Sequence, residues 1–190
     1  MSEQPHLAEV RVGSATDGRV PVSFASRSLG AGMRQWLAMA VVGFAAVAAD
    51  QVTKEFVRAE LVLGEAVDLA GPFAIHHVRN TGIAFGLFPG QASPVTILTG
   101  IAVVWMLVYF ARSGARHPLF PVAFGFLLGG SLSNLADRVR QGYVTDFLDP
   151  EYWPAFNLGD VFITIGVALL LAVFFFGERR SRVHSRAPAR

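Results

Sequence analysis

The sequence predicts an all-α membrane protein with four transmembrane helices. Hydrophobic residues make up 53% of its 190 residues and charged residues only 16%, whereas a soluble domain carries about 25% charged residues. Four long apolar runs divide the chain, and basic residues are distributed unevenly over the segments between them. The net charge of +2 and the absence of a basic patch give no indication of nucleic-acid binding. Cysteine is absent, which excludes disulfides and thiolate metal sites.

The apolar runs predict spans at residues 36–57, 94–111, 119–136 and 161–176. A helix of about 20 residues crosses the ~30 Å hydrocarbon core of a bilayer. The first run continues past Asp50, so Asp50 and Lys54 are expected near an interface or inside the bundle. These two residues are four apart on one helix, which suits a structural ion pair.

The basic residues orient the spans. With a cytoplasmic N-terminus, eleven basic residues are inside and five are outside, as the positive-inside rule requires. We therefore expect both termini in the cytoplasm. The inner residues are Arg11, Arg19, Arg27, Arg34, Arg112, Arg116, Arg179, Arg180, Arg182, Arg186 and Arg190, and the outer ones are Lys54, Arg58, Arg79, Arg138 and Arg140.

The chain divides into a four-helix membrane domain at 33–176 and two flanking segments. Residues 1–32 are expected to form a poorly ordered cytoplasmic extension, with no apolar signal-peptide core. Met33 as the true start is a hypothesis. Residues 177–190 form a basic cytoplasmic tail. In the outer segment after the first span, short apolar pieces between Gly and Pro residues predict small strands and turns.

Two aspartates at the outer ends of the last two spans suggest chemistry. Asp146 and Asp160 are fourteen residues apart, and ionisable groups at membrane depth favour a functional hypothesis. Two carboxylates in one low-dielectric site share a proton, which provides the base and the acid needed for peptide hydrolysis by water. The alternatives are that Asp160 only caps the last helix and that Asp146 is a solvated loop residue. The residue pattern alone leaves both possibilities open.

The other polar residues permit structural explanations. Adjacent Asp137 and Arg138 suit a helix end, where Arg138 anchors at the interface or clamps a carboxylate. Three asparagines beside Gly-containing turns are either turn residues or neutral groups that orient the acids. His76 and His77 point to opposite faces of a strand, so no metal site is expected there. The three asparagines are Asn80, Asn134 and Asn157.

Four motifs in order resemble the prolipoprotein signal peptidase (signal peptidase II) family over residues 33–176. They are Asp-Gln-Val-Thr-Lys at 50–54, Asn-Thr-Gly-Ile-Ala-Phe at 80–85, Asn-Leu-Ala-Asp-Arg at 134–138 with Gly-Tyr-Val-Thr-Asp-Phe at 142–147, and Phe-Asn-Leu-Gly-Asp at 156–160. Two positions depart from the family pattern, because Ser133 stands where Gly is usual and Gly159 where Ala is usual. Both residues are small, so helix packing should be preserved.

This resemblance implies an aspartic endopeptidase of the bacterial inner membrane that acts as a monomer. It would remove the signal peptide from a prolipoprotein by cleaving before a diacylglyceryl-modified Cys, without metal or cofactor. A small outer β-sheet would cradle the site, and a loop would cover it. The resemblance assigns catalysis to Asp146 and Asp160, support of the dyad or substrate binding to Asn80, Asn134, Asp137, Arg138 and Asn157, and structural roles to Asp50, Lys54, Gly82 and Phe85.

A small proton-coupled membrane transporter is the alternative function, since intramembrane acids also serve in such carriers. Transporters commonly contain internal repeats and broken midplane helices. The sequence has no evident repeat, and none of its expected spans is interrupted at the middle. The peptidase therefore remains the main expectation.

Overall fold

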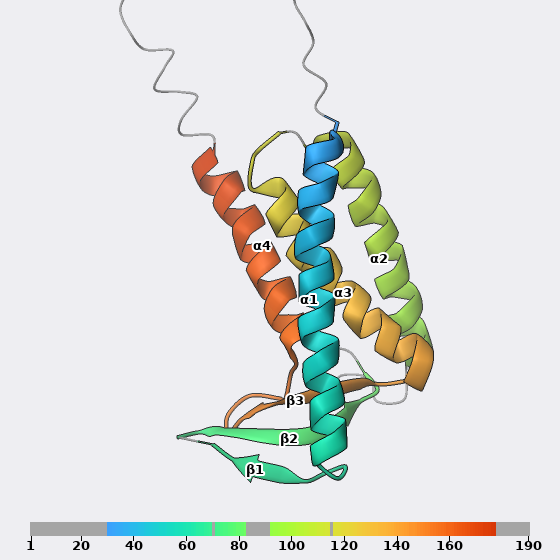
Figure 1. Ribbon diagram of the computed structural model, residues 1–190, viewed down its shortest axis with the longest axis vertical. Helices are drawn as coiled ribbons and strands as arrows, with labels where there is room; N and C mark the ends of the chain where they lie inside the picture. Colours follow the sequence, from blue (N-terminus) through green and yellow to red (C-terminus); the bar gives the residue numbers. More distant parts are fainter. Residues whose placement is uncertain (1–29, 70, 83–91, 115, 178–190) are drawn as a thin grey trace, which may run out of the picture.

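The computed structural model describes residues 30–69, 71–82, 92–114 and 116–177. Four helices stand side by side, and a small sheet lies across one end of them (Figure 1). Almost all residues of the two terminal tails lie outside the described ranges, and so does Phe85, for which a structural role is expected. The elements in order are α1 (Met33–Glu60), β1 (Ala66–Asp68), β2 (Phe73–Asn80), α2 (Ala92–Ser113), α3 (Phe120–Gln141), β3 (Val144–Pro150) and α4 (Leu158–Gly177).

The predicted membrane class, mostly helical with a small sheet, is confirmed. Among the described residues, α1, α2 and α4 are long and apolar enough to cross a membrane. The fourth helix, α3, has 22 residues, which at 1.5 Å per residue gives about 33 Å. It is not one of these three helices, and polar residues such as Ser133, Asn134 and Asp137 are buried on it. The count of four spans thus stays a prediction for α3.

Two adjacent glycines let α3 approach a different neighbour on each side. A Cβ on Gly129 would lie 2.7 Å from the carbonyl oxygen of Gly43 in α1. A Cβ on Gly130 would overlap the carbonyl oxygen of Gly159 at the start of α4. Small residues at such contacts allow helix backbones to pack closely within a membrane. As a result, α3 is the central helix of the bundle.

The two ends of the bundle have different interiors. Away from the sheet, the core is apolar and contains Met39, Val103, Phe110, Phe124 and Leu128. Near the sheet, buried polar residues replace it. Both ends of the described chain, at residues 30 and 177, lie at the apolar end (Figure 1).

The sheet is antiparallel in the order β1-β2-β3. The strand expected around His76 and His77 is β2, whereas no strand is expected in the second outer segment, which forms β3. Val78 pairs with Asp146 and Asn80 pairs with Val144, with a bulge between Ile75 and Val78. Because neighbours two positions apart on one strand share a face, this register puts Asn80 diagonally across from Asp146.

After β3 the chain folds back along the same strand. The Phe156 N–H donates to the Leu148 carbonyl at 2.9 Å, and the Leu148 N–H donates to the Phe156 carbonyl at 2.8 Å. These bonds fix the segment just before α4. The start of α4 is therefore held beside β3, where Asp146 lies.

Candidate active site

Asp146 and Asp160 line the same cavity, which has a volume of about 530 Å³. Asp146 comes from β3 and has only 2% of its surface exposed, and Asp160 lies in the first turn of α4. Much of the remaining wall is apolar. The other lining residues are Asn80, Asn134, Arg138, Val144, Trp153, Pro154, Ala155, Phe156, Asn157, Val161, Ile163, Thr164 and Ile165.

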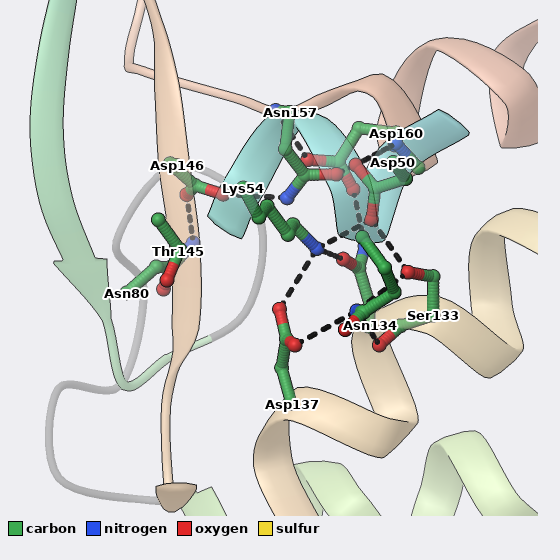
Figure 2. Close-up of polar contacts among 12 residues, drawn as sticks. Asp50, Lys54, Asn80, Ser133, Asn134, Asp137, Thr145, Asp146, Asn157 and Asp160 are labelled. Atoms are coloured by element: carbon green, nitrogen blue, oxygen red, sulfur yellow. Dashed lines mark hydrogen bonds and ion pairs between the residues drawn. The ribbon is translucent and has the colours of Figure 1, made fainter. Parts of the chain in front are cut away.

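Asn157 bonds to both aspartates (Figure 2). Its Oδ1 accepts from the Asp160 backbone N–H at 3.1 Å, and its own backbone N–H donates to Asp160 Oδ2 at 3.3 Å. This reciprocal pattern is a capping box at the start of α4. Its Nδ2 donates to Asp146 Oδ1 at 2.6 Å. Asp160 is therefore part of a helix cap, and the same cap holds Asp146.

Asn80 and Asn134 also donate their side-chain amides to the aspartates. Asn80 Oδ1 accepts from the Gly82 N–H at 3.0 Å, which leaves Nδ2 to donate to Asp146 Oδ2 at 2.9 Å. Lys54 Nζ donates to Asn134 Oδ1 at 2.7 Å, and Asn134 Nδ2 donates to Asp160 Oδ1 at 2.9 Å. In each case the amide oxygen is occupied elsewhere and the NH₂ group faces a carboxylate. The turn and orienting roles proposed for these asparagines are thus combined at Asn80.

A buried charge cluster lies beneath the aspartates. Lys54 forms the expected i,i+4 ion pair with Asp50 at 2.6 Å and a second ion pair with Asp137 at 2.9 Å. Lys54, Asp50 and Asp137 are all 0% exposed. Asp50 also accepts from the Gly159 backbone N–H at 2.8 Å, so the cluster ties α1 to α3 and to the start of α4.

Ser133 and Gln51 also belong to this cluster, although neither of them is assigned a role in the site from the sequence. Ser133 Oγ donates to Asp50 Oδ2 at 2.6 Å, and Gln51 Nε2 donates to Ser133 Oγ and to Asp137 Oδ1, both at 2.9 Å. The two departures from the family pattern, Ser133 and Gly159, therefore both contact Asp50. Ser133 and Asp137 are four residues apart on α3, and this spacing is the signal that relates them.

Arg138 and Gly82 meet at the mouth of the site. Arg138 Nη2 donates to the Gly82 carbonyl oxygen at 3.1 Å. Arg138 Nε is buried without a hydrogen-bond partner in the described part of the chain. Arg138 also lines the cavity, so its positive charge lies near the two carboxylates.

His76 and His77 have separate partners. His76 Nδ1 contacts Asp149 Oδ2 at 2.6 Å, whereas His77 Nδ1 donates to the Leu61 carbonyl at 2.9 Å. Within the described residues, no three His, Cys, Asp or Glu side chains are grouped to hold a metal ion.

Burial dominates the electrostatics of Asp146. Removal from water raises the pKa of this carboxyl to about 6, and the nearby Asp160 raises it in the same direction. The amide donors Asn80 and Asn157, followed by the positive charge of Lys54, act to lower the pKa. Near neutral pH, therefore, a proton is available to the pair at little cost, as an acid–base dyad requires.

Comparison with known proteins identifies a family for this chain. The model of the signal peptidase (SPase) II family matches residues 42–176. The chain is 36% identical to the lipoprotein signal peptidase of Symbiobacterium thermophilum over 145 residues, which cover 74% of this chain and 95% of that protein. It is 35% identical to the lipoprotein signal peptidase of Mesorhizobium japonicum over 153 residues, covering 78% and 91%.

Two solved structures described as bacterial membrane enzymes share the fold. One, determined at 2.3 Å, has a TM-score of 0.69 and 26% identity, and the match covers 80% of this chain and 93% of that one. The other, determined at 1.9 Å, has a TM-score of 0.66 and 29% identity, covering 73% and 92%. The chain, a multi-pass inner-membrane protein, belongs to the signal peptidase II (lipoprotein signal peptidase) family of proteases.

Proposed function

We propose that the protein is an aspartic endopeptidase in which Asp146 and Asp160 activate water to cleave one peptide bond of a prolipoprotein. The observation that carries this proposal is the shared position of the two carboxylates. They line one cavity and both bond to Asn157. A helix cap accounts for Asp160 alone, but it does not explain why a second buried carboxylate is held beside it.

In the proposed reaction, a water molecule lies between the two carboxyl groups. The ionised carboxylate accepts a proton from the water while the water oxygen attacks the peptide carbonyl carbon. The protonated carboxyl donates its proton to the carbonyl oxygen. The tetrahedral intermediate then collapses as the C–N bond breaks and a proton passes to the leaving nitrogen. Because the pair shares one proton, neither residue is assigned a fixed role.

The surrounding donors keep this pair in place during the reaction. Asn80, Asn134 and Asn157 hold the carboxylate oxygens without adding charge. Arg138 contributes its positive charge at the cavity wall. Preorganised donors of this kind stabilise developing charge better than mobile water does.

The proposed substrate carries a diacylglyceryl group on the Cys that follows the scissile bond. The apolar wall formed by residues such as Val144, Phe156, Val161 and Ile165 suits an acylated segment. The acyl chains would stay in the bilayer while the peptide bond reaches the dyad. We place the site at the outer face of the membrane, with both termini in the cytoplasm, and we expect the enzyme to act as a monomer.

The test uses purified protein in detergent and two synthetic precursors that differ only in the diacylglyceryl group. We expect mass spectrometry to detect a released signal peptide ending immediately before the modified Cys, and no cleavage of the unmodified precursor. Cleavage at another bond, or equal cleavage of both precursors, would contradict the proposed substrate. The contributions of Asp146 and Asp160 are tested separately by substitution.

A further inference from the structure

A second large cavity lies at the end of the bundle away from the sheet. It has a volume of about 730 Å³, which is in the range of ligand-binding pockets. Its walls come from α2, from α4 and from the central helix α3. It shares no residue with the cavity that holds Asp146 and Asp160. The lining residues are Trp105, Met106, Tyr109, Arg116, His117, Phe120, Phe124, Leu127, Leu170, Leu171, Val173 and Phe174.

The walls of this cavity are open to the surroundings of the bundle. Trp105 is 63% exposed, Leu171 is 50% exposed and Phe174 is 69% exposed. All three lie on helices that are long and apolar enough to cross a membrane. In a bilayer these side chains contact acyl chains, so the groove is accessible to lipid.

One end of the groove is cationic. Arg116 and His117 line it, and Arg116 makes no ion pair with a described carboxylate. The Leu119 N–H donates to His117 Nδ1 at 3.2 Å, which leaves Nε2 of this ring as a donor. Residues 30–49, 92–136 and 161–177 contain no Asp or Glu, so no acidic residue of these segments neutralises Arg116.

We propose that this groove binds one anionic phospholipid. An acyl chain lies along Trp105, Tyr109 and Phe174, and the headgroup phosphate bonds to Arg116 and His117. Guanidinium groups match the geometry of phosphate. The combination of an apolar groove with a cation at one end fits a phospholipid better than a soluble phosphate or a neutral lipid.

Native mass spectrometry of the whole protein tests this proposal. The delipidated protein is incubated with equal amounts of phosphatidylglycerol and phosphatidylcholine that have the same acyl chains. We expect one phosphatidylglycerol to be retained in preference to phosphatidylcholine. Inorganic phosphate at the same concentration should not displace it, because the acyl chain supplies part of the affinity.

Two variants locate the site. Arg116→Ala should reduce the preference for phosphatidylglycerol about fivefold, which corresponds to about 1 kcal/mol for one basic residue near anionic lipid. Leu171→Trp fills the groove and should reduce retention of both lipids. The matched control is Arg112→Ala, which removes an equal charge one turn earlier from a residue that does not line the groove.

The outcomes separate the proposal from general attraction to a basic surface. Preserved preference in Arg112→Ala with loss in Arg116→Ala supports the site. An equal loss in both variants, or no preference in the wild type, overturns it. Melting temperatures of each variant without lipid check that the protein is folded, and Leu171→Trp provides an answer if Arg116→Ala is unstable.

Discussion

Asn157 donates its side-chain amide to Asp146 at 2.6 Å while its amide oxygen caps the backbone of Asp160 at 3.1 Å. The amide cannot turn over without losing both bonds. The helix cap of α4 therefore sets the orientation of a carboxylate on β3. This arrangement links the start of a membrane helix to the sheet that lies across its end.

Substitution at Asn157 separates the cap from the support of Asp146. Serine is as good an N-cap as asparagine but has no NH₂ group to donate to Asp146. We predict that Asn157→Ser keeps the helix cap and loses about 10- to 100-fold in cleavage rate, the effect of losing a hydrogen bond to a charged group.

Asn157→Ala is the matched comparison, since it loses the cap as well. It should be about 1 kcal/mol less stable than Asn157→Ser, as measured by thermal unfolding in the same detergent. Equal stability of the two variants would show that the cap contributes little. Full activity in Asn157→Ser would show that the bond to Asp146 is not needed.

The cleavage rate should depend on pH through the shared proton of the dyad. Burial raises the pKa of Asp146 to about 6, so the folded state favours the neutral form. This preference contributes to the free energy of unfolding. The contribution is complete below the ordinary pKa near 4 and is lost as the pH rises through about 6. Activity should follow a bell-shaped profile, because it requires one ionised and one protonated carboxyl.

Asn80→Leu should move this profile toward higher pH. The substitution removes a donor that stabilises the charged form of Asp146, so the pKa of this carboxyl rises further. Arg79→Leu is the control, because the Arg79 side chain lies over the Tyr143 ring at 4.6 Å. A shift toward lower pH in Asn80→Leu, or equal shifts in both variants, would contradict the assigned contact.

Lys54 should be required for stability. Lys54→Met leaves Asp50 and Asp137 buried without their cation, which typically costs about 3–5 kcal/mol. Glu55→Gln removes the neighbouring ion pair with Arg58, in which the Glu55 side chain is 76% exposed. Exposed pairs contribute about 0–1 kcal/mol, so unfolding measurements should distinguish the two variants clearly. Similar stability of both would mean that the buried cluster is not a structural anchor.

Gly130 should tolerate no side chain. A Cβ there would overlap the Gly159 carbonyl oxygen, so Gly130→Ala must separate α3 from α4 and disturb the start of α4. Overpacking of this kind costs about 1–3 kcal/mol, and the cleavage rate should fall with it. Gly100→Ala in α2 is the control, because a Cβ at that position meets no atom within 4 Å. A melting temperature of Gly130→Ala equal to that of Gly100→Ala would contradict the close approach.

The sequence predicted the helices better than the sheet. Apolar runs of membrane length have few alternative structures, so the four expected runs lie in helices, apart from Leu119, which is the N-cap of α3. β3 is not evident from the sequence, because it lies in a short segment between two spans and its pairing with β2 depends on contacts distant in the chain. The expected Asp50–Lys54 pair was found because its i,i+4 spacing is local.

The geometry around the aspartates was not predictable from single residues. The NH₂ group of each asparagine faces a carboxylate because another group holds its amide oxygen. For Asn134 the group that holds the oxygen is Lys54, 80 positions away in the sequence. The contact of Ser133 with Asp50 likewise depends on how α1 packs against α3. Such relationships follow from tertiary packing rather than from a local pattern.

The most direct test of the proposed dyad is the cleavage rate of a diacylglyceryl-modified precursor by Asp146→Asn and Asp160→Asn. Asp149→Asn is the matched control on the same strand as Asp146, since Asp149 bonds to His76 instead. We predict losses of about 10²- to 10⁴-fold in both dyad variants, with folded protein retained and with the control close to wild type. A cleavage rate within tenfold of wild type in either dyad variant would contradict the account.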